Sequence, residues 1–502
     1  MTTNLPPLDI PPVDLIAILP FLFLSVAPLV LLLMSAVIRS RPPGWFYAGF
    51  TTIAGGAALA AAVVQWSDIG QGREPIRAIA GSINVDGFAV FLTGVIAIAV
   101  ILGGLLAAPY LEREGLNGPE FAALMCLSAS GGVLMVQAND LIVIFLGLEI
   151  LSIALYVMAG YHARRIESGE AAMKYFVLGA FSSALFLYGI AMIYGGTGST
   201  NLTEIASFLA QNTLLSEGTF LAGVALILVG LGFKVAAVPF HVWTPDVYQG
   251  SPTPATAFMA AAAKAAGFGA LLRVFSSTFG IYRLDWQPVI FAIAVLTLVV
   301  GSVLALVQTD VKRMLAYSSV SHAGYILIGL QAGTRAGISG ALFYILAYTF
   351  IVIGSFAVVM MVGRTGDARH NLDEYRGLSK RRPLLAFVFT VLLLAQAGVP
   401  LTSGFMAKFY VIRAVVEQGN YALALVGMLV AALATFFYLR VVVLMYMSDA
   451  EAGADTGRGS TDLIATPATA SVALGLAFAF TVAVGFIPGP VVELAQRATI
   501  LF

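Results

Sequence analysis

Long apolar runs recur along almost the whole chain and constrain its fold more than any other feature. A helix needs about 20 predominantly apolar residues to cross the roughly 30 Å hydrocarbon core of a bilayer. Prolines, glycines and charged clusters delimit fourteen such runs: 12–38, 44–65, 84–108, 119–137, 139–161, 171–195, 219–243, 252–275, 286–308, 313–332, 337–362, 384–415, 420–448 and 466–489. Only helices and closed barrels satisfy their backbone groups in lipid, so the sequence predicts an all-α polytopic membrane protein of about 14 transmembrane helices.

The composition agrees with this class and excludes others. Only 10% of the 502 residues are charged, against about 25% in soluble domains. A net charge of zero suggests no nucleic-acid partner. The single cysteine, Cys126, cannot form an internal disulfide or a Cys-rich metal site, so we expect no metal or redox cofactor bound by this chain alone. The stretch MTTNLPPLDIPPVD lacks basic residues, so the first apolar run is expected to remain as a helix.

Basic residues are distributed unevenly between the two sets of connecting loops. One set carries fifteen, namely Arg39, Arg41, Arg113, Arg164, Arg165, Lys312, Arg313, Arg364, Arg369, Arg376, Lys380, Arg381, Arg382, Arg440 and Arg458. The other carries seven, namely Arg73, Arg77, Arg273, Arg283, Arg335, Arg413 and Arg497. The positive-inside rule places the richer set in the cytoplasm, so both termini are expected in the periplasm.

The remaining four basic residues are lysines inside predicted membrane segments: Lys174, Lys234, Lys264 and Lys408. Each costs roughly 2.5–3.5 kcal/mol at the bilayer centre, and intramembrane charges generally mark function. Glu149 is the one acid that falls wholly inside a segment. These charges are therefore the candidate functional residues, although a purely structural role and, for Lys174, snorkelling to the interface are alternatives.

Glu149 and Lys174 lie on consecutive segments joined by the short loop HARRIESGE. Glu149 lies about 18 Å from the loop, at 1.5 Å per helical residue, whereas Lys174 lies close to it. We therefore expect electrostatic coupling between them rather than a direct salt bridge.

Two segments contain an internal proline next to a lysine. The seventh segment has Lys234 and then Pro239, whereas the twelfth has Pro400, between two glycines, and then Lys408. Proline removes a helical hydrogen bond, so each is expected to break its helix. Segments five apart cross the membrane in opposite directions, and paired broken helices indicate inverted repeats around an ion pathway.

The predicted organisation follows from this pairing. It consists of an N-terminal three-helix part (1–110), a first five-helix repeat of helices 4 to 8 (119–275), a second inverted repeat of helices 9 to 13 (286–448), and a C-terminal helix (466–502).

Histidines are the other candidate proton carriers. His241 follows Pro239, and a side chain with a reference pKa near 6.5 can gain and lose protons. His322, in AYSSVSHAGYILIG, is either a relay or a satisfied core histidine. His162 and His370 fall in predicted loops, where no specific role is expected.

Four stretches resemble the antiporter-like membrane subunits of respiratory complex I and their relatives in Mrp-type cation/proton antiporters. They are LGLEILSIALYVMAGY, AMKYFVLGAFSSALFLYG, GFKVAAVPFHVWTPDVYQGSPTPATAF and GVPLTSGFMAKFY, and the likeness covers nearly the whole chain. Within this family the chain most resembles the subunit N group. Three features support this: it stops soon after the fourteenth segment, its last intramembrane charge is Lys408 rather than a glutamate, and it contains KYFVLGAFSSALFLYGIAMIYG.

The resemblance implies a role for each charge. Glu149 and Lys174 would form a coupled pair, Lys234 and Lys408 would carry protons in the first and second halves, and Lys264 would connect them. NADH, flavin, iron–sulfur clusters and quinone would belong to other subunits. The implied partners are other complex I membrane subunits, including a sister antiporter-like subunit and small membrane subunits, together with lipids of the bacterial inner membrane. A subunit of an Mrp-type Na⁺/H⁺ antiporter and a structural membrane scaffold remain the alternatives.

Overall fold

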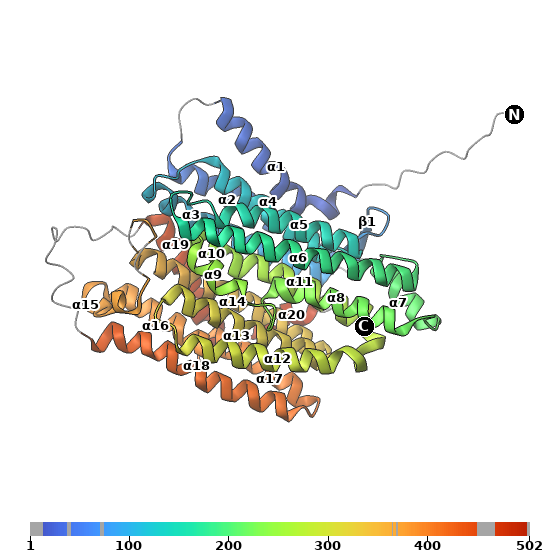
Figure 1. Cartoon of the computed structure of the whole chain (residues 1–502). Coiled ribbons are helices and arrows are strands. Elements are labelled where there is room, and N and C mark those ends of the chain that lie inside the picture. The colour runs from blue at the N-terminus through green and yellow to red at the C-terminus, as the bar shows by residue number, and fades with distance from the viewer. Residues whose placement is uncertain are drawn as a thin grey trace.

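The computed structural model describes residues 14–37, 42–70, 75–363, 365–367, 370–448 and 467–498. Six arginines of the loop comparison lie outside these residues: Arg39, Arg41, Arg73, Arg364, Arg369 and Arg458. The described chain is a bundle of helices with one short antiparallel hairpin, in which β1 (Ile76–Ala78) pairs with β2 (Ile83–Val85) (Figure 1). The predicted all-α polytopic class is confirmed.

Most of the helices run nearly parallel or antiparallel across the molecule (Figure 1). They are α1 (Leu15–Val37), α2 (Gly44–Gly70), α3 (Gly87–Arg113), α4 (Pro119–Gln137), α5 (Leu141–Ala159), α6 (Ile166–Thr197), α7 (Leu202–Gln211), α8 (Glu217–Val235), α9 (Trp243–Gly250), α10 (Thr253–Phe258), α11 (Lys264–Arg273), α12 (Arg283–Leu306), α13 (Val311–Ala332), α14 (Arg335–Val362), α15 (Leu378–Arg381), α16 (Pro383–Ala397), α17 (Ser403–Glu417), α18 (Tyr421–Met447), α19 (Ala468–Phe486) and α20 (Gly489–Arg497). Short π-helices η1 (Met259–Ala263) and η2 (Val274–Thr278) flank α11, and 3₁₀ turns η3 (Gly280–Tyr282) and η4 (Leu372–Tyr375) precede α12 and α15.

Twelve helical segments of the described chain are long and apolar enough to cross a membrane. Two predicted segments are not among them. One corresponds to α13, whose first turn carries Lys312 and Arg313. The other is divided into α16 and α17, each of 15 residues. The count of 14 therefore stays a prediction.

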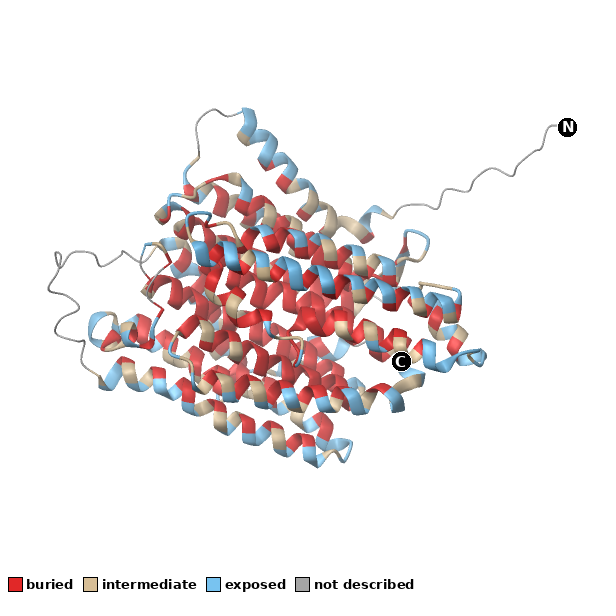
Figure 2. Cartoon of the chain, in the orientation of Figure 1, coloured by how far each residue is buried: buried red, intermediate tan, exposed pale blue. Residues whose placement is uncertain are grey.

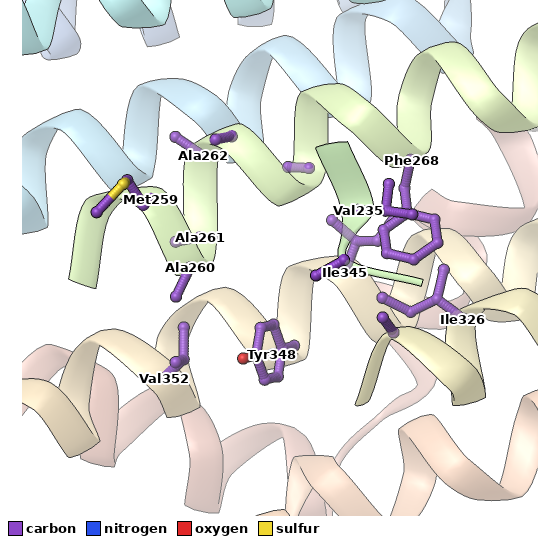
Figure 3. Close-up of a cluster of buried hydrophobic side chains, with 14 of the residues drawn as sticks. Val235, Met259, Ala260, Ala261, Ala262, Phe268, Ile326, Ile345, Tyr348 and Val352 are labelled. Atoms are coloured by element: carbon purple, nitrogen blue, oxygen red, sulfur yellow. The ribbon is translucent and has the colours of Figure 1, made fainter. Parts of the chain in front are cut away.

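The centre of the bundle is formed by α14 and by the segment from α10 to η2. Both are buried nearly all round, whereas α1, α6 and α18 turn exposed apolar faces outward (Figure 2). Figure 3 shows part of this core, where Val235 and the alanines of η1 pack near Tyr348 and Val352 of α14. Helices that are hydrophobic on every side belong inside a large bundle or in lipid, as observed here.

Close helix contacts occur at matching places in the two halves. A Cβ atom on Gly131 would lie 2.5 Å from the backbone nitrogen of Leu151, and one on Gly301 would lie 2.6 Å from that of Ser321. Small residues allow such backbone approach between membrane helices. Each residue of the second pair stands 170 positions after its counterpart in the first.

The same spacing appears at the ends of the helices. Asp140 forms an isolated β-bridge with Asn201, and Asp310 forms one with Asn371, again 170 positions later. Asp140 accepts hydrogen bonds from the first turn of α5, and Asp310 does so for α13. The two halves thus share one local design, in which a capping aspartate fixes the start of the helix.

The two segments that contain Pro239 and Pro400 are both broken. The helix α8 ends at Val235, Ala236 adopts a φ of +62°, and the Val238–Pro239 peptide bond is cis before α9 begins at Trp243. Backbone groups freed by the break find partners: Val238 N–H donates to Thr297 Oγ1 at 2.9 Å, and the Phe233 carbonyl accepts from Trp243 Nε1 at 3.1 Å. Irregular backbone at membrane depth requires such internal partners.

The second break lies between α16 and α17. Gly398 has a φ of +91° and Leu401 a φ of +68°, so Pro400 stands in a turn that cannot continue the helix. Thr402 Oγ1 caps α17 by accepting from Phe405 N–H.

Candidate functional site

Lys234 occupies the last turn of α8 and reaches towards α5 and α6. Its Nζ donates to Ser152 Oγ at 2.9 Å and to Tyr175 Oη at 3.2 Å, and lies 5.5 Å from the centre of the Tyr175 ring. Only 5% of the residue is exposed. The amine is thus held by neutral oxygen atoms and by an aromatic face, which attracts a cation.

Glu149 lies one turn from Ser152 on α5 and is half-buried. Its carboxylate accepts a hydrogen bond from Ser183 of α6. A cavity of about 10 Å³ is lined by Ser183, which bonds this carboxylate, and by Ser152 and Lys234. Such a volume is close to what one water needs. Glu149 and Lys234 are therefore joined through two serines and one water-sized space.

Lys174 does not pair with Glu149. Its Nζ lies 2.6 Å from Glu170 and 2.7 Å from Asp246, and 41% of its side chain is exposed. Asp246 also binds Arg313 at 2.6 Å. The two residues lie at different distances from the loop that joins their helices. Lys174 lies in the third turn of α6, beside an open cavity of about 480 Å³, whereas Glu149 lies near the middle of α5.

Lys264 is the next buried amine and points across to α13. Its Nζ lies 2.5 Å from both the carbonyl oxygen and the hydroxyl of Ser319, and 5.7 Å from the centre of the Tyr348 ring. This contact joins α11 to α13.

Lys408 lies on α17 and donates to the carbonyl oxygens of Gln396 and Ala397, at 2.9 and 2.8 Å. It also lies 4.7 Å from the centre of the Tyr325 ring. These carbonyls end α16, and the C-terminus of a helix attracts positive charge. The second break thus places a helix end directly against a buried lysine.

His322 lies in the same region, buried between two tyrosines. Its Nδ1 is 2.6 Å from Tyr344 Oη, and its Nε2 is 3.3 Å from Tyr438 Oη. Tyr438 in turn bonds Ser318 and Gln396. The structure therefore brings Lys264, His322 and Lys408 into one polar region of the second half.

His241 is not part of these networks. It lies half-buried in the turn between α8 and α9, and its Nδ1 has no hydrogen-bond partner among the described residues. Pro239 and Pro400 are exposed at the surface of the chain. Both break turns therefore reach the outside of the bundle, while the lysines beside them point inward.

Two loop histidines, for which no specific role was expected, have charged neighbours. His370 Nε2 lies 3.1 Å from Asp367, whose carboxylate also binds Lys312 at 3.0 Å and Arg165 at 3.3 Å. His162 lies 3.5 Å from Glu114. Their sequence context gave no signal, because the carboxylates come from distant segments.

Sequence reasoning also missed the uncharged members of the site: Ser152, Ser183, Tyr175, Ser319, Tyr438 and Gln396. The polar cluster around His322 was the one available hint. Across the described ranges, no group of three or more histidine, cysteine, aspartate or glutamate residues is placed to hold a metal ion.

Comparisons with known proteins agree with this geometry. A family model described as "NADH:quinone oxidoreductase/Mrp antiporter, TM" matches residues 138–434. The NADH-quinone oxidoreductase subunit N of Trichlorobacter lovleyi is 42% identical over 488 residues, covering 97% of each chain.

Two solved structures share the fold. A chain of respiratory complex I from Thermus thermophilus has a TM-score of 0.76 at 31% identity, covering 95% of this chain and 99% of that one. A chain of the Mrp complex from a Dietzia species has a TM-score of 0.82 at 22% identity, covering 97% of each, and shows the fold alone. On this evidence the chain belongs to the subunit N family of NADH-quinone oxidoreductases.

Proposed function

We propose that this chain is a proton-translocating membrane subunit of a bacterial NADH-quinone oxidoreductase. Its proposed proton-transfer residues are Glu149, Lys174, Lys234, Lys264, Lys408, His241 and His322. NADH oxidation and quinone reduction, with their flavin and iron–sulfur groups, would take place in other subunits.

One observation carries the proposal: three lysines are at least 95% buried, and among the described residues the hydrogen bonds from their amines all end on neutral oxygen atoms. A hydroxyl or carbonyl oxygen can accept from an ammonium and from a neutral amine alike. A carboxylate partner would instead favour the charged form. Lys234, Lys264 and Lys408 are therefore arranged to exist with and without the extra proton.

The mechanism follows the order of these groups. A change of charge near Glu149 acts on Lys234 across the Ser183–Ser152 route, so that Lys234 gains or loses a proton. Lys264 receives charge from Lys234 and presents it to Ser319 in the second half. His322 and Lys408 complete the route.

Within the described residues, no hydrogen bond joins Lys234 to Lys264. The stacked rings of Tyr175 and Trp243, 4.5 Å apart, lie beside Lys234. Proton transfer from Lys234 to Lys264 therefore requires water to enter between them. Quinone reduction in another subunit could control this entry of water.

The proposed setting is the bacterial inner membrane, with both termini in the periplasm and sister membrane subunits and lipids around the bundle. Residues 119–275 and 286–448 would be the two inverted repeats, between 1–110 and 466–502. The 170-residue spacing of the Asp140–Asn201 and Asp310–Asn371 bridges supports this division.

The decisive experiment replaces Lys234 with alanine in the assembled complex and measures NADH oxidation and proton pumping. We expect assembly to be retained and pumping to fall by at least about tenfold, because an apolar side chain cannot carry the proton. The control is Lys380→Ala, at an exposed lysine on α15. Unchanged pumping in an intact Lys234→Ala complex would falsify the proposal.

The Mrp-type antiporter is a second candidate because the chain shares its fold with an Mrp complex. Such a protein would exchange Na⁺ for H⁺ without NADH or quinone. Membrane vesicles given a sodium gradient and no NADH distinguish the two: ΔpH formation that depends on Lys234 favours the antiporter. A structural scaffold would instead tolerate Lys234→Met with full pumping.

A further inference from the structure

Gln396 is a buried amide in the last turn of α16, beside the second helix break. Only 1% of the residue is exposed. Its Oε1 accepts from Ser318 at 3.1 Å and from Tyr438 at 3.4 Å, and its Nε2 donates to Ser355 at 2.8 Å. One side chain of α16 is thus bonded to α13, α18 and α14.

The orientation of this amide is determined by its neighbours. Ser355 uses its own proton to bond the Ile351 carbonyl at 2.8 Å, so its oxygen remains as an acceptor for the amide NH₂. The amide oxygen must then face Ser318 and Tyr438, whose hydroxyls can donate. A buried amide with both ends satisfied in this way is rigid.

The backbone of Gln396 carries the acceptor for Lys408. The carbonyls of Gln396 and Ala397 belong to the end of α16, where no further helical turn can use them. The lysine stem also passes Gly398, whose added Cβ would lie 2.9 Å from Lys408 Cδ. Any rotation of this last turn would therefore move the two oxygens away from the amine.

Lys234 is not held by a helix end of this kind. Lys234 donates directly to the side chains of Ser152 and Tyr175, which lie on α5 and α6. Lys408 instead depends on backbone oxygens at a helix end. Its position is consequently only as fixed as the last turn of α16.

We propose that Gln396 is a positioning residue for Lys408: its amide, held by three neighbouring helices, aims the carbonyls at the end of α16 at the amine. The inference rests on the proposed proton-transfer function and adds to it a residue that never carries the proton. It also ties Lys408 to the His322–Tyr438 network, because Tyr438 bonds both His322 and the same amide.

The test compares two nearly isosteric substitutions in the assembled complex. Gln396→Met keeps the volume but removes the hydrogen bonds. Gln396→Glu, once its carboxyl is protonated, keeps an acceptor oxygen for Ser318 and Tyr438 and an O–H that can donate to Ser355, as the amide does. Gln211→Met, at the exposed end of α7, is the matched control. Proton pumping is measured with a pH-sensitive dye in proteoliposomes, per amount of assembled complex, alongside Lys408→Ala.

We expect Lys408→Ala to abolish pumping and Gln396→Met to lower it about five- to tenfold. Gln396→Glu should lower pumping while its carboxyl is charged, because a carboxylate favours the charged lysine, and should recover most of it, relative to the unsubstituted complex, as the pH falls. Full pumping with Gln396→Met, or losses for the Met and Glu variants that stay equal as the pH falls, overturns the positioning role while the proposed function stands. Full pumping with Lys408→Ala overturns the function itself.

A milder variant keeps the inference testable if Gln396→Met does not assemble. Ser355→Ala removes the acceptor of the amide NH₂ and leaves the other two hydrogen bonds of the Gln396 side chain, so a loss of about two- to fivefold is expected. Unchanged pumping in assembled Ser355→Ala complexes contradicts the proposed positioning.

Discussion

Ser152 Oγ lies 2.9 Å from Lys234 Nζ, so the buried amine of the first half is bonded to a side chain from the same helix as Glu149. Ser152 also donates to the Leu148 carbonyl at 2.5 Å, which leaves its lone pairs free to accept from the lysine. The serine is thus the last group between the carboxylate region and the amine.

Replacing Ser152 with alanine should slow pumping without disturbing assembly. The lysine keeps Tyr175 as an acceptor, so we expect a loss of about fivefold, corresponding to one hydrogen bond. The measurement is dye quenching in proteoliposomes at equal complex content, with Ser67→Ala at an exposed position as the control. Equal pumping by both variants would remove Ser152 from the route.

Lys174→Ala should affect pumping less than Lys234→Ala. Its side chain is 41% exposed and shared between Glu170 and Asp246, and exposed ion pairs contribute only about 0–1 kcal/mol. Initial pumping rates of the two variants, compared in the same preparation, decide the matter. A larger loss for Lys174→Ala would mean that the Glu149–Lys174 coupling suggested by the family forms in a state other than this one.

Gly404→Ala should destabilise the second break. Its added Cβ would lie 1.9 Å from the carbonyl oxygen of Ala395, a backbone atom that cannot move aside without shifting α16. We expect a loss of about 1–3 kcal/mol, as for other overpacked sites. Gly49→Ala, where nothing lies within 4 Å, is the control and should be neutral or stabilising. Thermal unfolding in detergent measures both, and similar melting temperatures would contradict the expectation.

The Asp367 cluster predicts a specific dependence of stability on pH. Burial alone raises the pKa of the Asp367 carboxyl, but Lys312 and hydrogen bonds from His370 and Thr253 outweigh it and hold the pKa well below its usual value. A depressed pKa stabilises the fold above the unfolded value of about 4, and this contribution is lost as the pH falls through the folded pKa.

Asp367→Asn should therefore lower stability by about 3–5 kcal/mol at neutral pH, because it leaves Lys312 buried without its counter-charge. The difference in melting temperature from the unsubstituted chain should be present at neutral pH and shrink below about pH 4. Glu417→Gln, in an exposed pair with Arg413, is the control and should show little difference. A difference that disappears by pH 6 would contradict the assignment.

The sequence was sufficient to predict the helical class, and it singled out Lys234, Lys264 and Lys408, which the structure buries. A charged side chain inside an apolar segment is costly unless it faces the protein interior or water. Proline alone was a weaker signal, because α1 continues through Pro20 and Pro28, whereas the segments with Pro239 and Pro400 are broken. The π-helices around α11 were not foreseen, because one extra residue in a turn leaves no mark in an alanine-rich run such as MAAAAKAA.

The partners of the charges were beyond sequence reasoning. Asp246 and Lys174 stand 72 positions apart, and Gln396 and Ser318 stand 78 apart. Serine, tyrosine and glutamine are common on any helix, so only the packing of α13, α14, α16 and α18 distinguishes the bonded ones. The exposed position of Lys174 depended on the open cavity beside α9, which spacing along α6 does not report.

The burial of three lysines limits how many protons they can hold at the same time. Lys234, Lys264 and Lys408 are all buried, and within the described part of the chain their amines bond neutral oxygen atoms, while Glu149 acts electrostatically on Lys234. Like charges repel strongly where water is scarce, so three full positive charges against one negative charge are unfavourable. We therefore expect that the three lysines are not all protonated at once. A proton that arrives at one amine then favours the loss of a proton from another.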